Sequence, residues 1–385
     1  MTRILVICND SDYFLRHRTP TVDRLVADGH EVTVITGGYP IPSETCRGWA
    51  YVNTPIERFA FHPLRDFALL RQTLRYLRAE RPAALHLITL KPAVFSGLAA
   101  ILARRLGRGP QRVVITIPGL GRLMSPASRQ GGWPAALMRT AVGWAIRSIG
   151  RPEGVHFTFE TAEDRHHWLK GGLVREENSS VISGAGVDPQ KFFPCQDRPR
   201  GGPVRILFAS RLLRSKGLDA FLELARVFKG DPRVRFVVAG MVEPHDPDGY
   251  STDALRSEAA IGFLGEIRDM PALLREIDLV CLPTRYGEGI PRILIEAAAS
   301  GVACLATDLG GCREIVKDGE TGTLVPPAET PELARTLIEA VRAYLDQPEI
   351  LEQHGRAGHA LFSKGDFTEA AVVKRFVSLL DPARN

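Results

Sequence analysis

Pro194-Cys-Gln-Asp-Arg-Pro-Arg-Gly-Gly-Pro203 is a polar stretch rich in proline and glycine, and the apolar run Val204-Arg-Ile-Leu-Phe-Ala209 follows it directly. Proline and glycine interrupt regular elements, and a buried strand is expected where the apolar residues resume. The stretch therefore predicts a boundary between two domains. We expect a first domain at 1–194, a linker at 195–203, a second domain at 204–366 and a C-terminal helix at 367–385.

Short apolar runs alternate with helical stretches on both sides of this boundary. The runs are rich in β-branched residues, which is typical of buried strands in a parallel sheet covered on both faces. The expected fold class is α/β, with two Rossmann-like, doubly wound domains that face each other across a ligand cleft. The C-terminal helix could pack across the edge of that cleft. The strand-like runs are Arg3 to Ile7, Glu31 to Thr36, Ala84 to Thr89, Arg112 to Ile117, Val155 to Phe159, Arg235 to Ala239, Ala260 to Leu264, Asp278 to Pro283 and Val302 to Thr307.

Length and composition limit the class of protein. With 385 residues, of which 44% are hydrophobic and 24% charged, the chain is expected to fold throughout as two globular domains. A net charge of +5 is small for a dedicated nucleic-acid binder, so no nucleic acid is expected as a partner. The six cysteines form no C-x-x-C pair, which favours a reducing, cytosolic compartment and no structural zinc. No apolar run is long enough to cross a membrane, so any membrane contact is expected to be peripheral.

The segment Tyr286-Gly-Glu-Gly-Ile-Pro-Arg-Ile-Leu-Ile-Glu296 follows a predicted strand and opens an alanine-rich helix. Pro291 fits the first helical position, and the free amides just before it lie where the helix dipole favours an anion or a hydroxyl group. The spacing of Glu288 and Glu296 can place both carboxylates on one side of the strand end. One could hold a sugar hydroxyl and the other a ribose diol. Taken alone, the two glutamates would fit better as a helix-start acid and a solvated helix residue, but the Gly289-Ile-Pro291 insert between them favours ligand binding.

A basic loop, Ser210-Arg-Leu-Leu-Arg-Ser-Lys-Gly217, comes directly after the first strand of the second domain. Arg211 and Lys216 lie where the carboxyl end of a parallel sheet binds ligands, and they could reach a pyrophosphate there. They could also be two surface cations that flank a turn. The loop alone does not decide between these interpretations, but its occurrence together with the glutamate segment favours phosphate binding.

Three further candidates follow strands of the first domain, at the edge where a doubly wound sheet binds ligands. Arg18 and Lys91 could bind an acceptor phosphate or be ordinary surface cations, and Gly119 begins a Gly-x-Gly turn. That turn lacks the G-x-G-x-x-G spacing and the acidic partner of a dinucleotide site, which disfavours a nicotinamide-dependent oxidoreductase. Lone histidines such as His86 are more often structural, and no spacing in the chain supports a metal site.

Two stretches of the first domain are basic and amphipathic. Leu64 to Arg81 has five arginines against two acids, and Arg129 to Arg151 has four arginines, no acid and two tryptophans. This composition is typical of segments that lie at a membrane interface. Each stretch could also be an ordinary packed helix with a solvated basic face. Peripheral attachment to the cytoplasmic face of the cell membrane is therefore a hypothesis.

Several of these motifs occur together in one known family. The chain resembles retaining glycosyltransferase family 4, which has the GT-B fold and includes sucrose-phosphate synthases, and the likeness covers nearly the whole length. It is closest to the bacterial undecaprenyl-diphosphate-linked sugar transferases of O-antigen, capsule and N-glycan assembly. The matching positions are Glu288 and Glu296 (E-x7-E), Arg211 and Lys216 (R-x4-K), Gly186-Val-Asp188 with Phe192 and Pro194, Leu87 to Pro92, Gly119-Leu-Gly121 and Gly311 to Glu314.

The resemblance implies substrates and a role for each candidate. The donor would be a UDP-N-acetylhexosamine or a similar UDP-sugar, and the acceptor a polyprenyl-diphosphate-linked saccharide. Arg211 and Lys216 would stabilise the departing diphosphate, so neither a metal nor another cofactor is required, and Glu288 would hold the donor sugar. The remaining donor-side residues implied are Gly289, Ile290, Pro291, Arg292 and Glu296, and the acceptor-side residues are Arg18, Lys91 and Gly119.

The expected mechanism is front-face displacement, because retention would have to occur without an evident enzymic nucleophile. The leaving UDP oxygen would accept the acceptor's proton while the protein stabilises charge. Many members of the family carry a histidine where this chain has Ile117-Pro118, so no catalytic base can be assigned. Two alternatives stay open: a UDP-N-acetylglucosamine 2-epimerase of the same architecture, and a non-catalytic nucleotide-sugar-binding subunit of a polysaccharide assembly complex.

Overall fold

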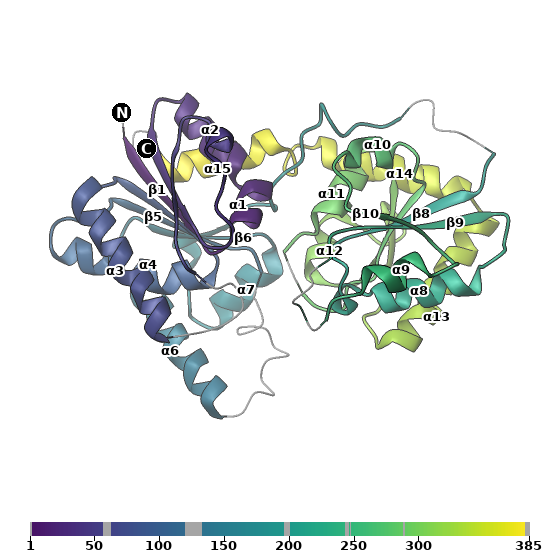
Figure 1. Cartoon of the computed structure of the whole chain (residues 1–385), viewed down its shortest axis with the longest axis horizontal. Coiled ribbons are helices and arrows are strands. Elements are labelled where there is room, and N and C mark those ends of the chain that lie inside the picture. The colour runs from purple at the N-terminus through teal and green to yellow at the C-terminus, as the bar shows by residue number, and fades with distance from the viewer. Residues whose placement is uncertain are drawn as a thin grey trace. The chain divides into compact units, whose positions relative to one another are not determined.

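The computed structural model describes residues 2–56, 63–119, 133–195, 201–242, 246, 248–287 and 289–381 (Figure 1). The chain divides into two compact units. The first unit comprises Met1–Ala185 together with Glu369–Asn385, and the second comprises Gly186–Thr368. Each unit contains one sheet of parallel strands with helices packed on it, which confirms the predicted α/β class with two Rossmann-like halves.

The division between the units falls at Gly186, whereas the sequence placed the linker at 195–203. Val187 donates its amide to the carbonyl of Phe367 at 3.0 Å and forms a parallel bridge with Thr368. Phe192 is buried in the core of the second unit. Residues 186–194 therefore belong with the second unit, because they pair with a segment far along the chain. Residues 196–200 of the predicted linker lie outside the described residues.

The sheet of the first unit is built largely from the strand-like runs of the sequence. Its order is β3-β2-β1-β4-β5-β6-β7, and neighbouring strands are parallel. Apolar side chains cover both faces of the central strands, as expected for a parallel sheet between two helix layers. The short edge strands β3 and β7 were not predicted. The strands are β1 (Arg3–Cys8), β2 (Glu31–Thr36), β3 (Ala50–Asn53), β4 (Ala84–Ile88), β5 (Arg112–Ile117), β6 (Val155–Phe159) and β7 (Ser179–Val181).

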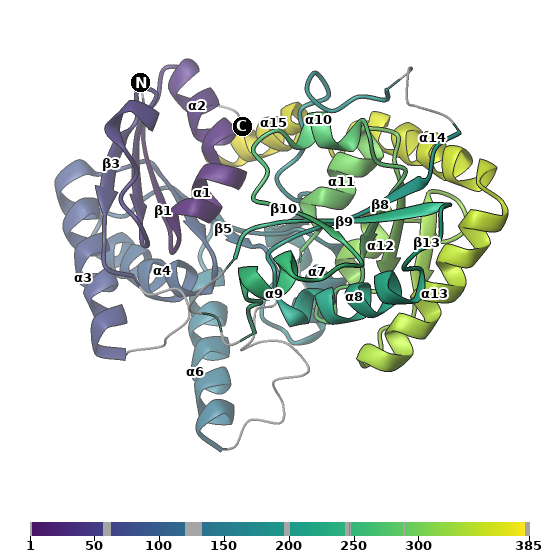
Figure 2. The ribbon, with the colours of Figure 1, turned by 45° about the vertical axis from the view of Figure 1, so that its right-hand side comes forward.

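Helices cover both faces of this sheet (Figure 2). On one face, α1, α2 and α15 bury Phe14, Val22 and Val377. On the other face, α3, α4, α6 and α7 bury residues such as Leu77 and Trp168. The C-terminal segment is thus a helix that packs on the first unit, beside α2. The helices are α1 (Ser11–His17), α2 (Thr19–Ala27), α3 (Pro63–Glu80), α4 (Leu90–Arg105), α6 (Trp133–Gly150), α7 (Ala162–Lys170) and α15 (Glu369–Leu380).

The sheet of the second unit has the order β10-β9-β8-β11-β12-β13, again with parallel neighbours. Its strands are β8 (Val204–Ala209), β9 (Val234–Ala239), β10 (Gly262–Gly265), β11 (Leu279–Leu282), β12 (Ala303–Thr307) and β13 (Gly322–Val325). The helices are α8 (Leu218–Val227), α9 (Thr252–Arg256), α10 (Met270–Leu274), α11 (Arg292–Ala299), α12 (Gly310–Ile315), α13 (Thr330–Asp346) and α14 (Glu349–Ser363).

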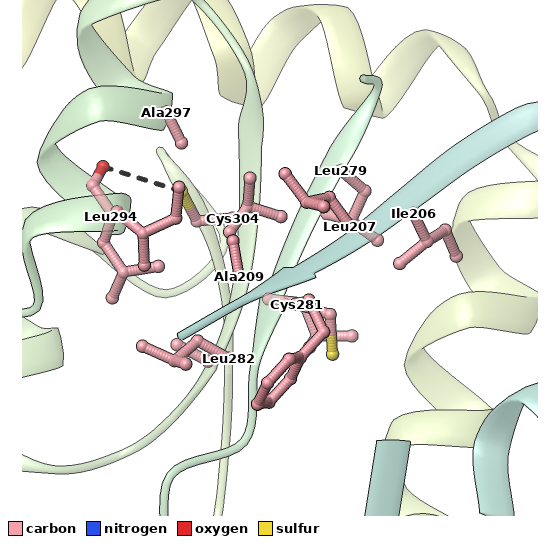
Figure 3. Packing of buried hydrophobic residues seen from close by; sticks show 14 of the residues in the cluster. Ile206, Leu207, Ala209, Leu279, Cys281, Leu282, Leu294, Ala297 and Cys304 are labelled. Carbon is pink, nitrogen blue, oxygen red and sulfur yellow. Dashed lines mark hydrogen bonds between the residues drawn. The ribbon is translucent and has the colours of Figure 1, made fainter. Parts of the chain in front are cut away.

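The core of the second unit contains buried cysteines among aliphatic side chains (Figure 3). Cys304 on β12 packs beside α11, where its thiol lies 4.0 Å from the carbonyl oxygen of Leu294. Burial raises the pKa of the Cys304 thiol to about 12, so it stays protonated and acts as a small apolar group. All six cysteines are free. Four of them, Cys8, Cys281, Cys304 and Cys312, are buried.

Candidate functional site

The candidate site of the second unit lies at the carboxyl ends of β8 and β11. These strands are neighbours at the point where the strand order reverses, which is where open α/β sheets bind ligands. β8 leads into the basic loop 210–217, and β11 leads into residues 283–291. The sheet topology therefore places two motifs that are far apart in the sequence side by side.

Tyr286 contacts both cations of the predicted diphosphate clamp. Arg211 donates from Nη2 to the Tyr286 hydroxyl at 3.2 Å, and Lys216 Nζ lies 5.0 Å from the centre of the Tyr286 ring. Lys216 is only 5% exposed, whereas lysine is almost never buried without a compensating partner. The face of an aromatic ring is such a partner, because it attracts a cation. Lys216 is therefore not a solvated surface cation.

The turn that carries Lys216 requires a glycine at its end. Residues 214–216 form one 3-10 turn, and Gly217 follows with a φ of +81°. A Cβ atom at Gly217 would lie 1.9 Å from the carbonyl oxygen of Pro283, so a larger residue does not fit. The amide of Arg285 donates to the carbonyl of Ser215 at 2.8 Å. These contacts hold the basic loop against the loop that follows β11.

Helix α11 begins at Arg292, and Pro291 is its N-cap rather than its first residue. Pro291 has a ψ of 118°, which is extended, and its carbonyl accepts from the amide of Leu294 at 3.0 Å. Ile290 is 6% exposed, and Gly289 beside it is buried as well. Glu288 lies outside the described residues, so its contact with a sugar hydroxyl stays a prediction.

Glu296 is buried on α11, which excludes its interpretation as a solvated helix residue. It is 9% exposed, and its Oε1 accepts from Arg292 Nε at 2.8 Å. Burial raises the pKa of the Glu296 carboxyl, although the positive charge of Arg292 opposes this shift. A buried carboxylate is costly unless it is paired. Arg292 therefore pairs with Glu296, and this contact is additional to the donor-binding role that the resemblance implied for Arg292.

Arg18 lies inside the first unit and is 1% exposed. Its Nη2 donates to Glu160 Oε1 and to the hydroxyl of Tyr13, both at 3.1 Å, and its Nη1 donates to the carbonyl of Gly184 at 3.3 Å. Its guanidinium lies 4.9 Å from the centre of the Phe376 ring on α15. Arg18 is not a surface cation. Phosphate binding by Arg18 stays a prediction that would require the displacement of Glu160.

Glu160 follows β6 directly and is 7% exposed. Burial raises the pKa of its carboxyl to about 7, although the charge of Arg18 and the hydrogen bonds from Tyr13 and Arg18 oppose the rise. Glu160 therefore exchanges a proton near neutral pH, unlike an ordinary glutamate.

Lys91 and Gly119 lie at the ends of two adjacent strands, β4 and β5. Lys91 is in the first turn of α4, and its Nζ lies 3.0 Å from the buried carboxylate of Asp66 on α3. Thr89, which precedes α4, has a φ of +76°, a strained value for a residue with a Cβ atom. Gly119 has a φ of +139°, which glycine adopts without strain. The structure thus brings Lys91 and Gly119 to one sheet edge, and Gly121 lies outside the described residues.

Two family models match the chain and together span most of it. Residues 16–183 match the glycosyl transferase 4-like domain, and residues 191–358 match the glycosyl transferases group 1. A sucrose-phosphate synthase from Thermosynechococcus elongatus has the same fold, with a TM-score of 0.73 at 20% identity over 98% of both chains. The chain belongs to the GT-B glycosyltransferases.

Two curated relatives of the chain come from bacteria. A phosphatidyl-myo-inositol mannosyltransferase from Mycobacterium tuberculosis is 33% identical over 48% of the chain and 50% of the relative. The chain thus spans about half the length of the first curated relatives that it matches. An N,N'-diacetylbacillosaminyl-diphospho-undecaprenol alpha-1,3-N-acetylgalactosaminyltransferase from Campylobacter jejuni is 26% identical over 83% of the chain and 82% of the relative.

Two absences concern the parts of the glycosyltransferase that the structure describes. In these parts, no group of three or more His, Cys, Asp or Glu side chains could hold a metal ion. No helix within the same ranges is long and apolar enough to span a membrane.

Three residues beside the candidate positions of the two units were not singled out by the sequence. Tyr286 stood in the quoted glutamate segment, but its contact with both cations depends on the pairing of β8 with β11. Asp248 contacts the basic loop from a segment between β9 and α9. Glu160 could have been found from its position in the sequence, because an acid directly after a buried strand lies at the ligand-binding edge of a parallel sheet.

Proposed function

We propose that the protein is a retaining family 4 glycosyltransferase that moves an N-acetylhexosamine, or a derivative of one, from a UDP-sugar to a polyprenyl-diphosphate-linked saccharide. The reaction would serve the assembly of a bacterial surface polysaccharide or glycan, such as O-antigen. The substrates follow the resemblance of the sequence and the name of the Campylobacter relative, which acts on a diphospho-undecaprenol-linked sugar.

The observation that carries this proposal is the pair of cations at the strand-order reversal of the second unit. Arg211 and the buried Lys216 meet at Tyr286, which lies in the loop that leads into α11. Two positive charges at the carboxyl end of a parallel sheet suit a diphosphate. Glu296 on α11 supplies a carboxylate for ribose hydroxyls, and its partner Arg292 keeps part of its charge compensated.

The proposed reaction breaks the bond between the anomeric carbon and the UDP oxygen. The acceptor hydroxyl forms the new bond on the same face, and its proton passes to the departing diphosphate oxygen. Arg211 and Lys216 stabilise the negative charge that grows on the diphosphate. Glu288, with the backbone amides of Gly289, Ile290 and Arg292, would hold the donor sugar in place.

The proposal includes no metal cofactor, because the two cations supply the charge that a divalent ion would otherwise supply. Transfer is therefore expected to survive extensive dialysis against EDTA. A loss of transfer that Mg²⁺ or Mn²⁺ restores would contradict this part of the proposal.

A panel of UDP-sugars with a short-chain polyprenyl-diphosphate-sugar acceptor tests the main proposal. We expect one UDP-N-acetylhexosamine to give a longer lipid-linked saccharide whose new linkage keeps the anomeric configuration of the donor. Conversion of UDP-N-acetylglucosamine to its epimer without acceptor would instead support the epimerase. Neither transfer nor donor hydrolysis by the folded protein would support the non-catalytic subunit.

We also propose peripheral contact with the cytoplasmic face of the membrane through the layer formed by α3, α4 and α6. These helices pack side by side on one face of the first sheet. Their sequences contain two acids, Asp66 and Glu80, and Asp66 is buried. Large apolar side chains and arginines together are typical of surfaces that bind anionic lipid. Exposed on this layer are Phe67, Leu102, Leu106, Leu137, Trp144, Arg71, Arg75, Arg78 and Arg105.

Vesicle co-sedimentation tests this contact. The protein is expected to bind phosphatidylglycerol-containing vesicles at low salt and to bind phosphatidylcholine vesicles weakly. Trp144→Ser and Arg75→Ser should lower binding, whereas Val227→Ser on α8, also an exposed apolar residue, should not. Equal binding by all three variants would contradict the assignment of this layer.

A further inference from the structure

Asp248 holds the turn that precedes Lys216, although it lies in a separate segment between β9 and α9. Its Oδ2 accepts from the amide of Ser215 at 2.9 Å, and its carbonyl accepts from the amide of Arg214, also at 2.9 Å. One residue thus satisfies two successive amides of the 3-10 turn 214–216.

The turn has no side-chain cap of its own. Leu213 is its N-cap and makes no side-chain hydrogen bond to the turn. The first amides of a helical turn lack partners within the turn and need an acceptor from elsewhere. Asp248 fills this position, and a carboxylate at the start of a helical turn is also favoured electrostatically.

Tyr250 fastens the same segment to the basic loop and to α8. Its amide donates to the carbonyl of Leu212 at 2.9 Å, and its hydroxyl bonds to the carboxylate of Asp219. Arg214 Nη1 also donates to Asp219, at 2.9 Å, and the Arg214 guanidinium lies 4.7 Å from the centre of the Tyr250 ring. Tyr250 therefore fixes the segment to the basic loop and to α8 just after Asp248.

The opposite side of the turn is held by the loop after β11, through the contacts of Arg285 and Pro283 described above. The backbone of the turn is thus held by Asp248 on one side and by the loop after β11 on the other. Lys216 is the last residue of this turn, so the direction in which its side chain leaves the backbone depends on both sets of contacts.

We infer that Asp248 is a positioning residue for the binding of a nucleoside diphosphate, acting through the turn that carries Lys216. This inference rests on the proposed function, because it takes Lys216 and Arg211 as the diphosphate-binding cations. Asp248 itself would not touch the ligand, since its carboxylate and its carbonyl accept from backbone amides of the turn. Loss of Asp248 should therefore weaken recognition of the diphosphate and leave recognition of the nucleoside unchanged.

Calorimetric titration of the full chain with UDP and with uridine tests this inference. Asp248→Ala is expected to weaken UDP binding by about tenfold, because the partly buried amide of Ser215 loses its acceptor and the turn relaxes. Uridine binding should stay within about twofold of the wild type. Asp248→Asn keeps an oxygen that can accept from Ser215, so it should recover most of the UDP affinity. Asp253→Ala, which removes an exposed carboxylate nearby, is the matched control.

Two outcomes would overturn the inference: an unchanged UDP affinity in folded Asp248→Ala, or an equal loss of UDP and uridine affinity. Tyr250→Phe removes only the hydroxyl that bonds to Asp219, and it should lower UDP affinity selectively but less. If Asp248→Ala does not fold, Tyr250→Phe is the test instead. An unchanged UDP affinity in Tyr250→Phe, or an equal loss of UDP and uridine affinity, would then overturn the inference as well. Wild-type protein that binds neither UDP nor any other nucleoside diphosphate would overturn the proposed function itself.

Discussion

The ammonium group of Lys216 lies 5.0 Å from the centre of the Tyr286 ring, and the same tyrosine accepts a hydrogen bond from Arg211. Two side chains of like charge are thus held at one aromatic residue, which is 37% exposed. Like charges repel, so a polyanion bound beside them, as the proposed function requires, would relieve this repulsion.

Lys216→Ala should lower the transfer rate at least ~100-fold, by analogy with the removal of a charge that stabilises a transition state. The exposed Lys229, two residues beyond the end of α8, provides a matched control, and Lys229→Ala should retain full activity. Initial rates with a saturating donor measure both. Near-normal turnover by folded Lys216→Ala would remove Lys216 from the mechanism.

Two substitutions separate the contributions of the hydroxyl group and the ring of Tyr286 to UDP binding. Tyr286→Phe removes the hydroxyl that Arg211 contacts and keeps the ring beside Lys216, so the UDP affinity should fall by about fivefold. Tyr286→Leu also removes the ring, and the combined loss should reach roughly thirtyfold. Tyr39→Leu, at an exposed tyrosine of the first unit, serves as the control. Equal affinities for the Phe and Leu variants would show that the ring contributes nothing.

Gly217→Ala should destabilise the second unit and abolish activity, because the new Cβ would overlap the carbonyl of Pro283 and force the backbone to move. We expect a loss of more than about 3 kcal/mol in the free energy of unfolding. Gly230 has a φ of +89°, and no atom lies within 4 Å of the place that a Cβ would take there, so Gly230→Ala should cost only about 1 kcal/mol. Denaturant unfolding of both variants measures the difference, and similar losses would contradict the steric argument.

Glu160→Gln should reveal a titration inside the first unit. Burial raises the pKa of Glu160 to about 7 from its ordinary 4.5, so between these values the folded protein keeps a proton that the unfolded chain releases. Wild-type stability, relative to Glu160→Gln, should therefore be highest below pH 4.5 and fall by on the order of 3 kcal/mol as the pH rises through 7. Unfolding measured across this range tests the sign, and a relative stability that increases with pH would contradict it.

Glu296→Gln should weaken uridine binding by about tenfold, since a charged acceptor of ribose hydroxyls is lost. Burial raises the pKa of Glu296, so the wild-type protein should also lose uridine affinity on mild acidification, sooner than an ordinary glutamate would allow. The glutamine variant should show a flatter pH profile. Uridine is the suitable probe because it carries no phosphate that titrates in this range, and parallel profiles would exclude Glu296 as the titrating group.

Much of the fold follows from local patterns of sequence. The apolar runs at Glu31–Thr36, Arg112–Ile117 and Val155–Phe159 are strands with the predicted bounds, because a strand buried on both faces needs an uninterrupted apolar run. The edge strands Ala50–Asn53 and Ser179–Val181 escaped prediction. They are short, and a sheet edge needs few apolar residues.

Features that depend on distant pairing could not be predicted in this way. The sequence around Arg18 does not distinguish it from a surface cation that follows a strand. Its burial depends on its partner Glu160, which lies 142 residues further along the chain. The unit boundary at Gly186 similarly depends on pairing with Phe367 and Thr368. The R-x4-K and E-x7-E pairs indicated the candidate site because their spacing is local, whereas Tyr286 and Asp248 required the order of the strands.

Helix α15 has a consequence for how the chain can be made and recombined. The first unit buries Phe14 and Val22 under a face that includes Val377, so its apolar surface is complete only after the second unit has been synthesised. During synthesis on the ribosome, the first unit could complete its fold only after residues 369–380 have been made, whereas the second unit does not need them to fold. An exchange of units between related enzymes would therefore have to carry α15 with the N-terminal part, as two separate pieces of gene.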